Sequence, residues 1–508
     1  MIEPLLGPEG VRRLRDALLA AGFTSDGVPA RLDQRSAAAL RSGDLALARH
    51  SLTGDDPLAT LIRLFSCGGT EPAGRVEAAV HPVPLADLVA AGMLVASGDE
   101  VRAGVDLQPY ADGTAPDSSE PWWVVADLPA ALRSGAVAAD GSRASEPLPV
   151  DHVLGIGGAS TTLALATMRR PVGRALDIGT GCGVQALHLA RHSGQVTATD
   201  VSDRALRFAA TTAALSGQEW ELLAGDLAAP VAGRRFDLVV SNPPFIMGPG
   251  DRPQVTYRDS GRAGDAVCAE LIRAMPDLLT DGGHAQFLAN WAHPTDGNWA
   301  ERLAGFLAGT GLDAWIIQRE VSDPGEYVRM WLSDVGDGDV ARASSWLDWF
   351  EAQRIEAVGF GIVNLRAGGH DDPTVRIEDL RQQPERPFGA LVPEWFDRQD
   401  WLRARPGSAL LAARLRAAES LSLHQESRRG PDGWSERDRR FVLAEGARWV
   451  EDTDELVAAL VAGSSGSVTV RDQLSLLAAA HGLDEAALAE AAVPAVTGLV
   501  ERGILLPA

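Results

Sequence analysis

Between residues 150 and 367, short apolar runs alternate with longer amphipathic segments. The apolar runs predict buried strands at 174–178, 195–199, 220–224, 236–241 and 284–289, and two final strands at 313–319 and 358–366. The segments with apolar residues at every third or fourth position predict helices at 184–191, 203–215 and 265–279. Strands that alternate with helices favour an α/β fold with a doubly wound, mainly parallel sheet.

The two flanking regions have a mostly helical pattern. Residues 1–150 contain a predicted helix at 84–91, a glycine, and two short strands, which is the outline of a winged helix, and then a short buried strand at 122–125. From residue 368 the chain is predicted to be helical again. Its tail, from Val468 to Leu506, has the pattern helix, turn, helix, strand of a second winged-helix-like module.

We therefore divide the chain into three regions, 1–150, 151–367 and 368–508. The central region carries an insertion at about 321–357, whose aromatic residues are spaced as they would be on helices.

The composition narrows the functions that fit. All 46 basic residues are arginine, against 69 acidic residues, so the formal net charge is −23. The absence of lysine excludes a lysine Schiff base, a lysine general base and a P-loop lysine. The acidic balance argues against a surface built mainly for nucleic acid. Residues 401–440 are a local exception, with nine arginines against five acidic residues, and we interpret them as a solvated helix face.

The cysteines, the first residues and the length of the apolar runs predict the cellular compartment of the protein. Cys67, Cys182 and Cys268 lie far apart and are odd in number, so neither a disulfide framework nor a cysteine-based zinc site is expected, and no metal is predicted. The first residues lack the pattern of a signal peptide, and no run of about eighteen apolar residues predicts a membrane span. We expect a cytoplasmic protein that has no membrane partner.

The strongest motif lies where the first strand of the central region ends. There Asp177 precedes three glycines at alternate positions, Gly179, Gly181 and Gly183, and a helix begins after them. Glycines let the chain turn tightly and let a ligand approach backbone amides. A phosphate-binding Rossmann loop would have the spacing G-x-G-x-x-G. The spacing here resembles motif I of class I S-adenosylmethionine (SAM) methyltransferases, in which the loop passes under the amino-acid end of SAM and the acid hydrogen-bonds to that end.

Two further acids follow later strands. Asp200 ends the next strand, where a carboxylate can accept hydrogen bonds from both ribose hydroxyls. Asp226 and Leu227 follow the third strand, where the resemblance implies an acid near the adenine and a backbone amide beside it. The order of these motifs along the chain predicts SAM as the methyl donor and S-adenosylhomocysteine as the product.

The sequence Ser241-Asn-Pro-Pro-Phe245 ends the fourth strand and indicates the reaction. It matches the N-P-P-[FYW] motif of SAM-dependent N-methyltransferases that act on planar nitrogen. The side-chain oxygen of Asn242 and the carbonyl of Pro243 can each accept an N–H hydrogen bond, which orients the nitrogen and stabilises the charge developing on it. Phe245 can stack on the planar group, and the prolines hold the carbonyls in a fixed turn.

Residues 172–291, approximately, resemble the core of the glutamine N5-methyltransferases that modify release factors, and also the small family of rRNA guanine N2-methyltransferases. The resemblance implies a Rossmann-like class I core with a seven-stranded, mainly parallel sheet, and catalytic roles for Asn242, Pro243 and Phe245. A looser match at 257–265 makes Tyr257 and Arg258 candidate substrate contacts, and Pro244 of the Asn-Pro-Pro-Phe motif is a third. The whole chain looks like a group of long actinobacterial-type methyltransferases of unassigned substrate.

Several alternatives remain for the acceptor and for the flanks. We expect a protein or peptide amide, glutamine-like, because the net charge of −23 disfavours RNA. An RNA base amine (guanine N2 or adenine N6) comes second, then a small-molecule amine, then a non-catalytic SAM-binding regulator. The termini suit docking of a partner or a homodimer. Residues 152–162 are interpreted either as a cover over SAM or the target, or as the turn by which the chain enters the domain.

Overall fold

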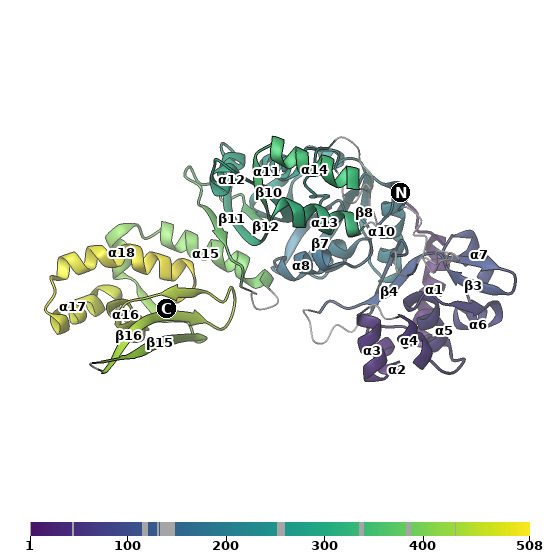
Figure 1. The fold of residues 1–508 in the computed structure, drawn as a ribbon, viewed down its shortest axis with the longest axis horizontal. Helices are drawn as coiled ribbons and strands as arrows, with labels where there is room; N and C mark the ends of the chain where they lie inside the picture. Colours follow the sequence, from purple (N-terminus) through teal and green to yellow (C-terminus); the bar gives the residue numbers. More distant parts are fainter. Residues whose placement is uncertain are drawn as a thin grey trace. The chain divides into compact units, whose positions relative to one another are not determined.

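The computed structural model describes residues 2–42, 45–113, 120–129, 132, 148–250, 260–334, 340–382, 388–431 and 433–508 (Figure 1). These residues form two compact units. The first unit contains residues 1–164 and 170–379, and the second contains residues 165–169 and 380–508. Within the described part of the chain, no helix is both long and apolar enough to cross a membrane.

An eight-stranded sheet forms the centre of the first unit, which confirms the predicted Rossmann-like α/β class. The strand order is β13-β11-β12-β10-β9-β6-β7-β8. In chain order the strands are β6 (Val172–Ile178), β7 (Ser193–Asp200), β8 (Glu221–Ala224), β9 (Phe236–Ser241), β10 (Leu279–Pro294), β11 (Asp313–Ser322), β12 (Ile355–Arg366) and β13 (Val375–Asp379). Only β12 runs antiparallel to its neighbours, and the other pairs are parallel.

The sheet has one strand more than the seven predicted. The additional strand is β13, which pairs in parallel with β11 at the edge of the sheet. Its side chains are exposed or only partly buried, so its sequence lacks the continuous apolar run that marks the buried strands.

Helices cover both faces of the sheet (Figure 1). They include α9 (Val184–Leu189), α10 (Asp203–Leu215), α11 (Ala266–Leu278) and α12 (Trp299–Leu307). The helix α10 begins where the Ser202 side chain accepts a hydrogen bond from the Ala205 amide, which satisfies one of the free donors of the first turn. One apolar core joins α11 and α12 to the sheet, and a second core joins α9 and α10 to the amino-terminal residues.

The insertion between β11 and β12 is helical, as its spacing predicted. It consists of α13 (Pro324–Asp334) and α14 (Val340–Ala352). Its buried Tyr327 lies among aromatic rings and accepts hydrogen bonds from the Met247 amide at 2.6 Å and from Asn290 Nδ2 at 2.9 Å. The Trp346 indole donates to the Met247 carbonyl at 3.1 Å. The insertion therefore holds the chain directly after the Asn-Pro-Pro-Phe motif.

The amino-terminal region contains the predicted winged-helix arrangement. Four helices come first: α1 (Gly7–Ala21), α2 (Gly27–Arg31), α3 (Gln34–Arg41) and α4 (Leu45–Ser51). The winged-helix part then has α5 (Pro57–Leu61), η1 (Ile62–Ser66), β1 (Thr70–Pro72), α6 (Ala73–Ala79), α7 (Leu85–Ala90), β2 (Leu94–Ser97) and β3 (Glu100–Ala103). Its antiparallel sheet has the order β1-β3-β2.

A hairpin joins this region to the central sheet. It consists of β4 (Asp106–Tyr110) and the fully buried β5 (Trp122–Ala126), which confirms the predicted buried strand. The amides of Trp123 and Val125 donate to the Ser216 and Thr212 hydroxyls, at 3.1 and 3.0 Å. These contacts place residues 1–150 and the central sheet in one compact unit. A separate domain ending at residue 150 stays a prediction.

The second unit corrects one prediction. Residues 414–443, expected to be helical, form β14 (Arg414–Ala417), β15 (Leu421–Gly430) and β16 (Gly433–Leu443). Most residues of the β15–β16 hairpin are exposed, so the arginine-rich segment lies on a hairpin rather than on a helix. Pairing across the turn between Gly430 and Gly433 outweighs the local helical pattern, and Gly433 has a φ of +118°.

The remaining elements of this unit include the helix, turn, helix and strand that were predicted from Val468 to Leu506. They are η4 (Phe388–Ala390), α15 (Leu391–Arg403), η5 (Gly407–Ala412), β17 (Val450–Asp452), α16 (Glu455–Gly463), β18 (Ser465–Thr469), α17 (Val470–His481), α18 (Glu485–Glu501) and β19 (Leu505–Pro507). The small sheet has the order β18-β14-β19, so its central strand comes from before the helices.

Candidate functional site

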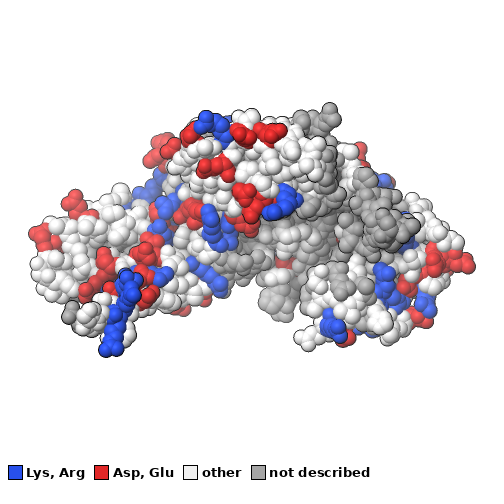
Figure 2. Space-filling model, viewed as in Figure 1, with Lys and Arg blue, Asp and Glu red and all other residues white. Residues whose placement is uncertain are grey.

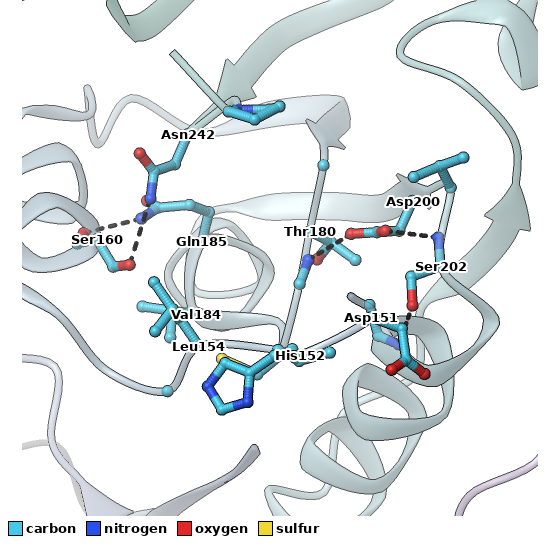
Figure 3. A pocket seen from close by; sticks show the side chains of 18 of the residues that line it. Asp151, His152, Leu154, Ser160, Thr180, Val184, Gln185, Asp200, Ser202 and Asn242 are labelled. Atoms are coloured by element: carbon cyan, nitrogen blue, oxygen red, sulfur yellow. Dashed lines mark hydrogen bonds between the residues drawn. The ribbon is translucent and has the colours of Figure 1, made fainter. Parts of the chain in front are cut away.

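A pocket lies at the carboxyl ends of β6, β7, β8 and β9, which meet at one edge of the sheet (Figure 3). We call it the first pocket. Among the residues predicted from sequence, those that line it are Gly179, Gly181, Asp200, Asp226, Leu227, Asn242 and Pro244. Residues that sequence reasoning did not single out also line it, among them Asp151, Thr180, Val184, Gln185 and Ser202.

The glycine loop between β6 and α9 forms the floor of the first pocket. Gly179, Gly181 and Gly183 have φ values of +71°, +56° and +89°, which favour glycine. A Cβ on Gly179 or Gly181 would meet no atom within 4 Å, whereas a Cβ on Gly183 would lie 2.7 Å from the Trp220 ring. The first two glycines therefore border open space, and the third serves packing.

Asp177 lies beneath this loop and is completely buried. Its Oδ2 accepts a hydrogen bond from the Thr180 hydroxyl at 2.6 Å. No described residue donates to its Oδ1, which is also buried. Burial raises the pKa of Asp177 to about 7, and the neighbouring Asp200 carboxylate adds to that increase.

Asp200 lies at the end of β7 and faces the first pocket. Its Oδ2 accepts from the Gly181 amide at 2.8 Å and its Oδ1 from the Ser202 amide at 2.9 Å (Figure 3). Burial raises the pKa of this carboxyl, while the two amides oppose that rise. Each oxygen keeps a second lone pair for another donor.

Asp226 and Leu227 follow β8. The Arg262 guanidinium binds Asp226 Oδ2 at 2.8 Å and Glu270 Oε2 at 2.5 Å, so it spans the outer rim of the first pocket. Leu227 has a φ of +44°, and its carbonyl accepts a hydrogen bond from the Thr199 hydroxyl at 3.0 Å. The loop after β8 is thereby held against β7.

Asn242 stands between two cavities. Its Nδ2 lies 3.4 Å from the Ser160 hydroxyl, to which it donates (Figure 3). Its Oδ1 is buried and receives no hydrogen bond from the described residues. The Ser160 carbonyl in turn accepts from Gln185 Nε2 at 2.8 Å. Ser160 thus orients the amide so that the oxygen is left for another donor.

A second pocket lies on the other side of Asn242. Its lining includes Pro243 and Phe245 of the motif, Ile246 directly after it, residues 154–160, and the more distant Asp106, Gln108, Pro129 and Trp331. Leu154, Gly155, Ser160 and Asn242 line both pockets. Residues 154–160 therefore border both cavities, which favours the interpretation of this segment as a cover.

Two of the predicted substrate contacts, Tyr257 and Arg258, lie outside the described residues. Sequence reasoning also did not single out Gln185 or Asp106, whereas Ser160 lies in the segment 152–162 that it interpreted as a cover or an entry turn. Ser160 and Asp106 lie far from the motifs along the chain, and no spacing rule connects them to Asn242.

Comparisons with known proteins agree with this geometry. A family model described as "Methyltransferase small domain" matches residues 157–301. Models described as domains of unknown function match residues 20–104 (DUF7059) and 393–507 (DUF7782). The flanking regions thus match families to which no function is attached.

Individual relatives match the central region. The release factor glutamine methyltransferase of Deinococcus radiodurans is 38% identical over 201 residues, which are 36% of this chain and 69% of that protein. The ribosomal RNA small subunit methyltransferases C of Alcanivorax borkumensis and Escherichia coli are each 36% identical over 118 and 120 residues, 23% of this chain. The chain spans about a third of the length of these two, 32% and 31%. By its match to the release factor glutamine methyltransferase and by the order of its strands, the chain belongs to the class I SAM-dependent methyltransferases.

Proposed function

We propose that this protein transfers a methyl group from SAM to a planar amide nitrogen of a protein or peptide, resembling a glutamine side chain. The observation that carries the proposal is the Asn242 amide. Its nitrogen is engaged by Ser160, and its buried oxygen, at the boundary of the two pockets, has no donor among the described residues. A buried acceptor without a donor is costly, so a ligand N–H is expected to fill this position.

The first pocket fits SAM. Gly179 and Gly181 leave open space above the loop, where the amino-acid end would lie. The spare lone pairs of Asp200 supply acceptors for the ribose hydroxyls, and Asp177, buried beneath the loop, keeps an unpartnered Oδ1 that the family resemblance assigns to the amino-acid end. Asp226 and Leu227 would border the adenine, as the family resemblance implies. When bound, SAM supplies an electrophilic methyl group on a sulfonium.

The second pocket would hold the acceptor. An amide nitrogen is a poor nucleophile because its lone pair is delocalised, so it must be held in line with the methyl group. Asn242 Oδ1 and the Pro243 carbonyl accept its two N–H bonds and stabilise the positive charge that grows on nitrogen. The N–C bond forms as the C–S bond breaks, and the nitrogen then releases one proton to water. Phe245 lies on the planar group.

The charges near the pockets favour a protein over RNA. Among the described residues that line either pocket, none is an arginine. Arg262 at the rim is paired with Asp226 and Glu270. Figure 2 shows acidic and basic side chains interspersed on the face in view. Phosphate contacts dominate the affinity of RNA-binding proteins, and the described residues that line the two pockets offer no arginine for such contacts.

An RNA base amine is the second candidate. It is favoured by the exposed arginines of the β15–β16 hairpin, among them Arg428, Arg429 and Arg437, and by the rRNA methyltransferase relatives. Labelled SAM, incubated with the protein and a cell extract, separates the candidates. We expect protease-sensitive label. RNase-sensitive label would favour RNA, label on small molecules would favour a metabolite, and no label despite SAM binding would favour the regulator.

The substitution Asn242→Ala tests the role of the amide. We expect SAM affinity, measured by calorimetry, to be nearly unchanged and turnover to fall by roughly 10²–10³-fold, because the nitrogen loses its oriented acceptor. Ser160→Ala is the companion variant. It leaves Asn242 in place but releases its orientation, and a loss of about 10-fold is expected. Unchanged turnover in Asn242→Ala would exclude the assignment.

A further inference from the structure

The second pocket contains a carboxylate from a distant part of the chain. Asp106 begins strand β4 in the amino-terminal region, and it lines this pocket together with the Asn-Pro-Pro-Phe motif. Its exposed fraction is 6%. Nothing in the methyl-transfer step described above uses this residue.

Asp106 has no cationic partner among the described residues. Its Oδ1 accepts a hydrogen bond from Gln108 Nε2 at 2.9 Å, a neutral donor. Burial raises the pKa of this carboxyl to about 6, and no basic group opposes the rise, so the carboxyl is largely ionised at neutral pH. A buried charge without a cation is unfavourable unless something pairs with it.

The position of Asp106 is set by the fold. Strand β4 pairs with β5, where Asp106 lies opposite Ala126, and β5 is bonded to α10 through Thr212 and Ser216. On the pocket side the chain approaches closely at Gly155. A Cβ there would lie 3.1 Å from Asp106 Oδ2, so the glycine leaves that oxygen accessible from the pocket.

Besides Ser160 and Gln108, which also carry donors, the second pocket presents two side-chain oxygens as hydrogen-bond acceptors. Asn242 offers its free Oδ1, and Asp106 offers Oδ2. A substrate that fills the pocket and binds both oxygens must therefore carry two hydrogen-bond donors. The donor that best fits the Asp106 carboxylate is a cationic group. The apolar lining, which includes Ile156, Phe245 and Trp331, suits the aliphatic stem of a long side chain.

Resting on the proposed function, we propose that Asp106 is the specificity residue of the acceptor pocket and binds an arginine or lysine side chain next to the methylated amide. The amino-terminal region thus contributes directly to substrate choice. Pairing removes the unfavourable burial of a lone carboxylate, so a basic neighbour is favoured over a neutral one.

Calorimetry with synthetic peptides tests this inference independently of turnover. The full-length protein, with S-adenosylhomocysteine present, is titrated with acetyl-Ala-Arg-Gln-Arg-Ala-amide, its lysine analogue and its citrulline analogue, which has nearly the same shape without the charge. We expect the wild-type protein to bind the arginine or the lysine peptide at least about 10-fold more tightly than the citrulline peptide, as for a lost charge pair. Whichever of the two binds more tightly identifies the base.

Three variants make the test specific. Asp106→Asn is expected to bind the charged and citrulline peptides within about twofold of each other. Asp87→Asn removes one exposed charge from the same region and is expected to keep the full preference. Gly155→Ala crowds Asp106 Oδ2 but retains the charge, so it is expected to weaken the binding of the charged peptides. The SAM affinity of this variant is measured as a check.

Each result supports or overturns the inference. It is overturned if the wild-type protein shows no preference for the charged peptides, or if Asp106→Asn keeps that preference. It is also overturned if Asp106→Asn instead weakens the binding of S-adenosylhomocysteine, which would assign the carboxylate to the cofactor. It is also overturned if a single-stranded RNA competes with the peptides and loses affinity in Asp106→Asn. Asn242→Ala separates the two proposals: it is expected to lose turnover yet keep the preference for a basic neighbour.

Discussion

Asp177 combines complete burial with a carboxyl group and has a single described hydrogen-bond donor, the Thr180 hydroxyl. Burial raises its pKa from 3.8 to about 7. Because the folded-state pKa lies above the unfolded-state value, ionising Asp177 costs folding free energy. Stability is therefore expected to fall as the pH rises between about 4 and 7, by at most about 1.4 kcal/mol per pH unit, and the loss stays constant at higher pH.

The comparison of wild type with Asp177→Asn isolates this effect, because all other groups titrate in both proteins. Urea unfolding measured from about pH 5 to about pH 8 is expected to show wild type losing stability relative to the variant up to about pH 7. Stability curves that run parallel across this range would contradict the raised pKa.

At the scale of elements, the hairpin β4–β5 connects the amino-terminal region to the methyltransferase sheet. Thr212 on α10 is fully buried, and its hydroxyl accepts the Val125 amide at 3.0 Å. Thr212→Val keeps the shape but leaves a buried N–H without an acceptor. We expect a loss of about 1–3 kcal/mol in the free energy of unfolding, measured in urea.

Thr211→Val is the matched control for that prediction. The Thr211 hydroxyl accepts the amide of Leu5, which is only partly buried and can turn to water instead. A smaller loss is therefore expected. Equal losses in the two variants would show that the β5–α10 hydrogen bond has no special importance for the junction.

At the scale of the whole molecule, both pockets belong to one of the two compact units. Every described residue that lines the first or the second pocket belongs to the first unit. A chain that ends at Asp379 is therefore expected to bind SAM within about threefold of the full-length affinity, measured by calorimetry. If that chain is folded by circular dichroism but has lost SAM binding, the second unit contributes to the cofactor site.

The sequence by itself determined the glycine loop after Asp177, the acids Asp200 and Asp226 that follow the next two strands, and the Asn-Pro-Pro-Phe motif. Each of these features is local: it consists of a strand end and the few residues that follow it, so a pattern of neighbouring residues specifies it. The same holds for the alternating strands and helices, and hence for the class of the central sheet.

Tertiary structure decided which distant residues complete the site. Ser160 orients Asn242 from 82 residues away, and Asp106 reaches the second pocket because its partner strand β5 is bonded to a helix 87 residues further along. The β15–β16 hairpin likewise replaced a predicted helix, since cross-strand pairing is invisible to a local pattern. Contacts between residues far apart depend on how the elements pack, and no period or spacing along the chain encodes them.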